Sequence, residues 1–257
     1  MDRSAAARAE PHVEERGMKI LAVNVNTTRT MTHSIAEAAR AAARPGTEIV
    51  ELTPSFGADS VEGSFESYLA AVGVMDAVVT YDGDFDAVIQ AGFGEHGKEG
   101  LMELLDVPVV DITEAAAHLA MLIGHRFSVV TTLDRTVPGI EDRLTCFGLS
   151  AHCASVRSSG LGVLELEDAG AARRAVAAQA RQAVEADRAE VIVLGCGGMA
   201  GLDAQLTADL GVPVVEGVTA AVKLAEGLGD LRLSTSKVRA FAPPRPKRVS
   251  GWPLSAR

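Results

Sequence analysis

The chain contains few cysteines, no long apolar run and no surplus of positive charge. Only three of its 257 residues are cysteines, none in CxxC spacing, which excludes a disulfide framework. It also indicates a reducing compartment, so we expect a cytoplasmic protein. The formal net charge of −10 argues against a nucleic-acid partner, which requires a basic surface. No apolar run reaches the roughly 18 residues that cross a bilayer, so no membrane partner is expected.

Metal-ligand spacing is absent as well, because the six histidines form no such pattern, so we predict no metal and no other cofactor. Residues 1–17 lack an apolar segment, which excludes a signal peptide and predicts a disordered extension. By contrast, 47% of the residues are hydrophobic, enough for a large core.

A repeated motif organises the rest of the chain. The apolar run at residues 191–194 leads into glycines that flank Cys196, and residues 87–94 show the same order with Gly92 at the equivalent position. A Val-Pro-Val-Val sequence follows in each half, at residues 107–110 and 212–215. Self-similarity over this length indicates two equivalent halves.

Apolar runs alternate with helical patterns through both halves, which predicts parallel sheets. We therefore predict an α/β protein of two pseudosymmetric lobes, each a mostly parallel sheet flanked by helices, with the site in the cleft between them. The first lobe is expected at residues 18–118 and the second at 119–225. The C-terminal tail, 226–257, is expected to pack back onto the first lobe.

Polar or glycine-rich segments follow the predicted strands in both halves. In the first half these are Asn24–Thr28 and Gly92–Gly94, and in the second half Thr131–Thr132 and Cys196–Gly198. Ligands of open parallel sheets bind at the carboxyl ends of the strands, so all four segments are expected at one cleft.

Cys196 is the strongest candidate for chemistry. A thiol between a buried strand and a helix N-terminus is favoured as the thiolate. Gly197 and Gly198 leave backbone N–H groups open as an oxyanion cradle. The alternative is a buried structural thiol. We predict no chemical function for Cys146, at the end of a helical pattern, or for Cys153, inside an apolar strand.

The segment Gly92–Gly97 also fits the GxGxxG pattern, with Asp111 about 20 residues later, as in dinucleotide-binding proteins. Its place after the third strand, its short helix and its absence from the second half count against a nucleotide enzyme.

Several motifs in the same order resemble those of the hydantoin racemases, members of the aspartate/glutamate racemase superfamily. They are Asn24–Thr28, Val61–Phe65, Ala91–Gly94, Val130–Thr132, Leu194–Met199 and the tail segments 243–247 and 251–253. The resemblance implies a cofactor-independent racemase or epimerase that transfers a proton at the Cα of 5-substituted hydantoins or related amino-acid derivatives. We expect a small-molecule substrate and a homo-oligomer.

The chain departs from that family at one position that bears on the reaction. The family places one cysteine at each repeat position, and the two act on opposite faces of the substrate. Here Gly92 stands where the first cysteine belongs, and Glu95 and His96 replace an Asp-Pro pair. Two-base racemisation needs a group on each face, so His96 or an ordered water is the candidate substitute. Replacing Gly92 with cysteine is expected to raise racemase activity.

The resemblance assigns Cys196 as the proton donor and acceptor. It also implies substrate contacts from backbone N–H groups and polar side chains, at Phe93, Gly94, Gly197, Gly198, Asn26, Thr27 and Thr132. Two alternatives stay open. The arylmalonate decarboxylases, which resemble this pattern with a glycine and a cysteine, need only a single acid. A ligand-binding protein without catalysis is the other.

Overall fold

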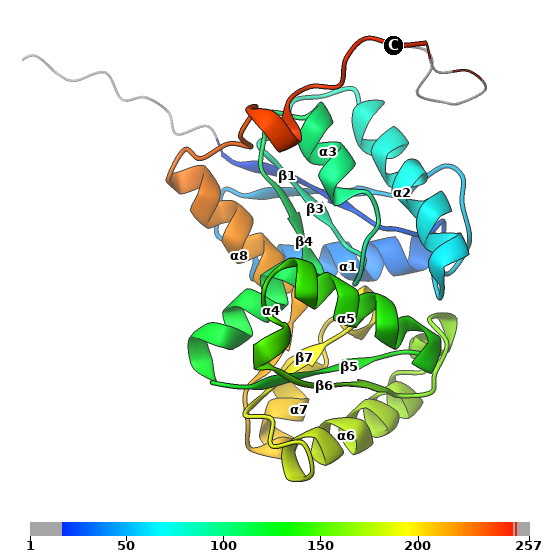
Figure 1. Cartoon of the computed structure of the whole chain (residues 1–257), viewed down its shortest axis with the longest axis vertical. Helices are drawn as coiled ribbons and strands as arrows, with labels where there is room; N and C mark the ends of the chain where they lie inside the picture. The colour runs from blue at the N-terminus through cyan, green and yellow to red at the C-terminus, as the bar shows by residue number, and fades with distance from the viewer. Residues whose placement is uncertain (1–16, 249, 251–257) are drawn as a thin grey trace, which may run out of the picture.

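The computed structural model describes residues 17–248 and 250. Residues 1–16 of the predicted extension and residues 251–257 of the tail lie outside the described residues. Two four-stranded parallel sheets form two lobes, one above the other in Figure 1. The strand orders, β2-β1-β3-β4 and β6-β5-β7-β8, are equivalent, which confirms the predicted pseudosymmetric α/β fold.

The two central strands of each sheet are buried along almost their whole length, because helices cover both faces. Val23 pairs with Gln90, and Val130 pairs with Leu194, so the central strands of each lobe end level with each other. The strands are β1 (Lys19–Val23), β2 (Glu48–Leu52), β3 (Ala87–Gln90), β4 (Val109–Asp111), β5 (Phe127–Thr131), β6 (Cys153–Ser158), β7 (Val191–Leu194) and β8 (Val214–Glu216).

Eight α-helices alternate with these strands in the described part of the chain: α1 (Arg29–Ala42), α2 (Ser64–Val79), α3 (Lys98–Leu104), α4 (Ile112–Ile123), α5 (Val137–Cys146), α6 (Ala169–Glu185), α7 (Asp203–Leu210) and α8 (Gly217–Asp230). Five short 3-10 turns join them: η1 (Asp134–Thr136), η2 (Ser150–His152), η3 (Leu164–Glu167), η4 (Gly197–Met199) and η5 (Arg239–Phe241). No helix among the described residues is both long enough and apolar enough to cross a membrane.

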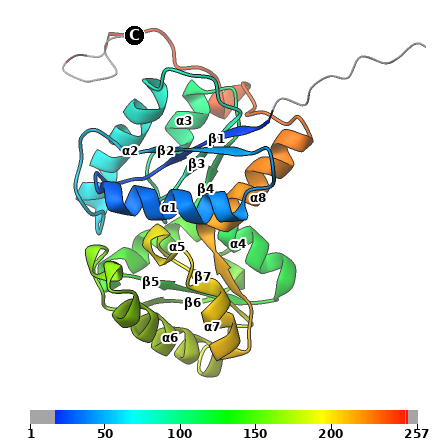
Figure 2. The ribbon, with the colours of Figure 1, turned by 180° about the vertical axis from the view of Figure 1, so that it is seen from behind.

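Two helices are exchanged between the lobes. Helix α4 follows the first sheet in sequence but packs against β5 and β7 of the second, and its Ala117 and Ala120 enter that core. Helix α8 follows the second sheet but packs against α1 and β3, with Val218 and Val222 in the first core. The two helices also contact each other, so they join the lobes (Figures 1 and 2). The lobe boundaries expected at residues 118 and 225 therefore fall inside α4 and α8.

The segment that follows α8 has little regular structure and lies on the first lobe. The backbone N–H of Thr235 donates to the carbonyl of Asp106 at 3.0 Å, and the Lys237 Nζ donates to the carbonyl of Met102 at 2.6 Å. These contacts hold the tail against the end of α3.

Candidate active site

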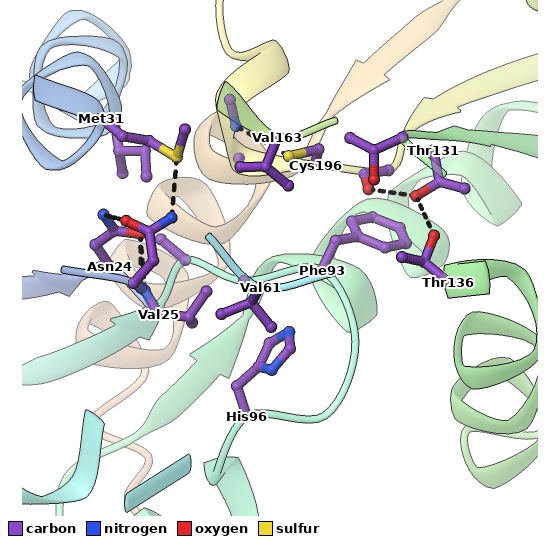
Figure 3. Close-up of a pocket in the computed structure, with 18 residues that line it drawn as sticks. Asn24, Val25, Met31, Val61, Phe93, His96, Thr131, Thr136, Val163 and Cys196 are labelled. Carbon is purple, nitrogen blue, oxygen red and sulfur yellow. Dashed lines mark hydrogen bonds between the residues drawn. The ribbon is translucent and has the colours of Figure 1, made fainter. Parts of the chain in front are cut away.

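A pocket lies where the carboxyl ends of the strands of both lobes meet (Figure 3). The cavity is small in the ligand-free protein, about 40 Å³, and it opens to solvent. Its lining comes from the strand-end segments and neighbouring loops of both lobes: Asn24, Val25, Asn26, Met31, Ile35, Val61, Ala91, Gly92, Phe93 and His96 from the first, and Thr131, Thr132, Thr136, Val163, Gly195, Cys196, Gly197 and Gly198 from the second.

Most of the predicted site residues are brought together here, and two are not. Gly92 and Cys196 line the same pocket, as do five of the seven predicted binding residues. Thr27 lies outside the lining, because its backbone N–H and its hydroxyl both donate to the carbonyl of Ala58. Gly94 also lies outside, and its N–H donates to the Thr113 hydroxyl at 2.8 Å, so it is not open to a ligand.

The turn that follows β1 contains Asn24 and Asn26, and it orients the Asn26 side-chain amide as a hydrogen-bond donor. The Asn26 Oδ1 accepts hydrogen bonds from the Asn24 Nδ2 at 2.8 Å and from the backbone N–H of Thr28 at 3.0 Å. These two bonds fix the orientation of the buried amide. Among the described residues, the Asn26 Nδ2 then donates only to the Met31 thioether sulfur, at 3.2 Å, which is a weak acceptor. A carbonyl oxygen in the pocket would be a stronger partner.

In the second lobe, Thr131 at the end of β5 takes the place of the asparagines that follow β1. The Thr131 hydroxyl donates to the carbonyl of Gly195 at 3.1 Å and lies 3.1 Å from the Thr136 hydroxyl. This bond ties the end of β5 to the segment that carries Cys196. The two lobes therefore use different side chains to connect equivalent strand ends.

Cys196 is followed by a 3-10 turn and not by the predicted helix. The turn is η4, its first residues are capped by Cys196, and α7 begins only at Asp203. The backbone N–H of Gly198 donates to the Cys196 Sγ at 3.4 Å. One N–H of the predicted cradle is thus already directed at the thiol itself.

The Cys196 thiol is neutral in the ligand-free protein. Burial raises its pKa to about 11, the Gly198 N–H opposes this rise, and the charges of Glu216 and Glu62 add to it. The expected thiolate is therefore wrong for this state, because one N–H and a short turn do not offset desolvation. Cys196 is an acid first, and becomes a base only after it has given up its proton.

The lobes approach each other through their backbones beside the thiol. A Cβ at position 197 would lie 2.8 Å from the carbonyl oxygen of Ala91 in the other lobe. Glycine at position 197 therefore permits a contact that any side chain would break.

The side chains of His96 and Val25 occupy the space next to Gly92 in the pocket lining. A Cβ at this position would lie 2.4 Å from the His96 Cδ2 and 2.4 Å from the Val25 Cγ1. The space that a second cysteine would need is thus occupied, and the expected gain from Gly92→Cys requires these side chains to move first. Core packing leaves few voids, so a missing side chain is replaced by others.

His96 and Glu95 lie in very different surroundings although they are adjacent. His96 is 5% exposed and its Nδ1 has no hydrogen-bond partner among the described residues. Burial lowers its pKa to about 4, against an opposing effect of the Phe93 carbonyl, so the imidazole is neutral at pH 7. Glu95 is exposed, and its carboxylate accepts from the backbone N–H of Gly97 at 2.7 Å.

A buried cluster of charged side chains lies next to the loop at residues 92–97, because Lys98 at the start of α3 belongs to it. The fully buried Asp111 accepts from Glu114 N–H at 2.7 Å and from the Arg143 guanidinium at 3.2 Å, and the Lys98 ammonium lies 3.7 Å away. Asp111 is therefore unavailable to a ribose, which removes the support for the dinucleotide alternative. Sequence patterns missed this cluster, because nothing in the spacing pairs Arg143 with the other lobe.

Two valines on the pocket wall were not predicted as site residues. Val61 follows β2 and Val163 follows β6, so they occupy similar places in the two halves. Val61 opens one of the motifs that carry the resemblance, whereas Val163 belongs to none of them. In the described part of the chain, no three His, Cys, Asp or Glu side chains are grouped as a metal site requires.

Comparison with known proteins identifies the family. Residues 20–225 match the family described as Asp/Glu/Hydantoin racemase. The chain is 39% identical to a hydantoin racemase of Pseudomonas sp. (strain NS671), over 91% of this chain and 95% of that protein. It is 68% identical to the crystal structure of allantoin racemase from Pseudomonas fluorescens, with a TM-score of 0.90, over 91% of this chain and all of that one.

Arylmalonate decarboxylase, at 19% identity and a TM-score of 0.57 over 81% of this chain and 92% of that one, shares the fold alone. The chain therefore belongs to the Asp/Glu/hydantoin racemase family and is an isomerase of the racemase class.

Proposed function

We propose that the protein racemises 5-substituted hydantoins at C5 without a cofactor, and that allantoin, which is 5-ureidohydantoin, is its substrate. The observation that carries this proposal is the shared pocket, to which one lobe contributes Cys196 and the other contributes the Gly92 wall. The substrate follows from the 68% identity to an allantoin racemase.

The reaction is a proton exchange at the carbon beside the C4 carbonyl. Removal of the C5 proton leaves an enolate whose negative charge lies largely on the carbonyl oxygen. The Asn26 Nδ2, whose present partner is a thioether, is the donor best suited to that oxygen. One face of the enolate receives a proton from the Cys196 thiol, and the other face exchanges with a base on the first lobe.

The base on the first lobe must come from the loop at residues 92–97, where Glu95 and His96 are the titratable side chains. Burial lowers the pKa of His96 to about 4, which makes its imidazole a weak proton acceptor near neutral pH. We therefore assign the base to Glu95, which must turn inward when substrate binds, and we assign His96 to the pocket wall.

Decarboxylation of an arylmalonate is the second candidate. It is favoured by one observation, namely that the pocket contains a single thiol, which is protonated in the ligand-free protein. Decarboxylation generates the carbanion without a base, so one acid would complete the reaction.

One experiment separates these functions and a binding role. The protein is incubated in D₂O with one enantiomer of allantoin or of 5-benzylhydantoin, or with phenylmalonate, and followed by proton NMR and polarimetry. The proposal predicts deuterium at C5 together with loss of optical rotation. Carbon dioxide release from phenylmalonate without hydantoin exchange would establish the decarboxylase instead. Ligand binding with neither reaction would indicate a non-catalytic binder.

A further inference from the structure

Two loops from different lobes meet beside the pocket. Val61 belongs to the loop after β2 and Val163 to the loop after β6, and both side chains line the pocket (Figure 3). Between them, the Glu62 Oε1 accepts a hydrogen bond of 2.8 Å from the backbone N–H of Val163. A side chain of one lobe thus binds the backbone of the other at the pocket.

The packing around this bond is close on both sides. A Cβ at Gly162 would lie 3.1 Å from the Glu62 Oε1, and a Cβ at Gly63 would lie 2.5 Å from a guanidinium nitrogen of Arg135. Glycine at position 162 therefore leaves room for the Glu62 carboxylate, and glycine at position 63 leaves room for the Arg135 side chain. A second, exposed bond between the lobes joins the Thr30 hydroxyl to Glu167 at 3.1 Å.

Glu62 is also close enough to act on the reacting thiol through its charge. Together with Glu216, the negative charge of Glu62 raises the pKa of Cys196. The Cys196 side chain is only partly exposed, and Leu166 from the same region as Val163 packs toward Gly198. A substrate that reaches the thiol must therefore pass close to the two loops.

We propose that Glu62 is a positioning residue whose carboxylate fastens the loop of one lobe to the backbone of the other and so closes the pocket in front of Cys196. The loops separate when this bond breaks, substrate enters, and the bond re-forms over it. The effect on turnover rests on the proposed racemase function, but the closure itself does not.

The closure is tested by the rate at which Cys196 is alkylated in the full-length protein. Two reagents are compared, small iodoacetamide and the bulkier N-ethylmaleimide, and the Cys196 peptide is quantified by mass spectrometry. Both reagents react with the thiolate, so the ratio of their rates cancels any change in ionisation and reports access alone. The exposed Cys146 is the internal reference.

In Glu62→Ala we expect the ratio of N-ethylmaleimide to iodoacetamide rates at Cys196 to rise about tenfold, the size typical of one hydrogen bond to a charged group. Glu62→Gln keeps an oxygen that accepts the Val163 N–H, so its ratio stays near that of wild type. Glu165→Ala is the matched control, because it removes an equal charge whose bond to Gly162 stays within one loop.

A second variant removes the donor of the same hydrogen bond, the backbone N–H of Val163 in the second lobe. Val163 has φ of −60°, which proline adopts without strain, so Val163→Pro removes the N–H donor and keeps an apolar side chain. It should raise the ratio as Glu62→Ala does. Equal ratios in wild type, Glu62→Ala and Val163→Pro would overturn the closure, and so would an equal rise in Glu165→Ala.

Racemisation kinetics then separate the closure from the proposed function. Glu62→Ala should raise KM for allantoin about tenfold with a smaller change in kcat, and Glu62→Gln should leave KM nearly unchanged. If wild type racemises nothing but the alkylation ratios behave as described, the proposed function fails and the closure stands.

Discussion

The two lobes have the same strand order and equivalent strand ends, yet they differ at one pair of positions. Cys196 in the second lobe presents a thiol to the pocket, while Gly92 in the first presents no side chain. The vacancy at position 92 is filled by His96 and Val25, which approach to distances that no side chain at 92 could tolerate. The comparison teaches that the two lobes share a fold but not the side chain at this position, and under the proposed function the first lobe acts through another residue of the same loop.

The largest expected effect comes from removing the thiol that distinguishes the second lobe. Cys196→Ala should lower C5 exchange and racemisation by about a thousandfold or more, because the pocket then has no group to exchange a proton on that face. Exchange is measured by proton NMR in D₂O, with Cys146→Ala as the control. Full activity in Cys196→Ala would contradict the role of this thiol.

The next effect concerns Glu95 and His96, the two titratable side chains in the first-lobe loop that contains Gly92. Glu95→Gln should lower kcat for racemisation about a hundredfold, the lower range for loss of a general base. His96→Asn should lower it less, because an imidazole with a pKa of about 4 is a weak proton acceptor near neutral pH. Both variants are compared at saturating substrate, and a larger loss in His96→Asn would reverse the assignment.

Introducing a cysteine side chain at position 92 tests how tightly His96 and Val25 pack in the first lobe. Gly92→Cys alone should destabilise the protein by about 1–3 kcal/mol, because its Cβ collides with His96 and Val25. The double variant Gly92→Cys/His96→Ala should recover part of that loss and be more active than the single variant. Thermal unfolding and racemase assays of both are the measurement. If the single variant is as stable as wild type and more active, His96 and Val25 move aside at little cost, and the expected collision is contradicted.

The smallest effect is a pH dependence of stability that arises from buried cysteines in the second lobe. Burial raises the pKa of Cys153 and of Cys196, both in the second lobe, to about 11. The folded state therefore holds these protons more tightly than the unfolded chain does. The resulting stability is complete below about pH 8, and it is lost as the pH rises toward 11. Cys153→Ala should show a smaller fall of melting temperature than wild type between pH 8 and 10.5. An equal fall would contradict the shifted pKa.

Much of the fold was predictable from the sequence because its strands and turns are locally encoded. The apolar run of β7 and the mainly apolar run of β3 identify buried strands, and the repeat places Gly92 and Cys196 at equivalent ends. The pairing of Val23 with Gln90 and of Val130 with Leu194 then brings the predicted segments to one edge in each lobe.

What escaped prediction depends on contacts between distant residues. An apolar helix face does not specify which sheet it covers, so the crossing of α4 and α8 was not evident. The surroundings of His96 depend on how tightly the loop after Gly92 folds back, which residue types do not encode. The state of the Cys196 thiol was missed for a related reason, since burial outweighed the local effect of the backbone N–H groups.

The exchange of α4 and α8 has a consequence for the origin of the duplicated chain. A single ancestral half, equivalent to β1 through α4, would have carried a final helix with no sheet of its own to cover. Such a half would have been stable only as a swapped dimer, in which each copy lent that helix to the other. Fusion of two such halves would join chains that already depended on each other, and positions 92 and 196 would then be free to differ within one chain.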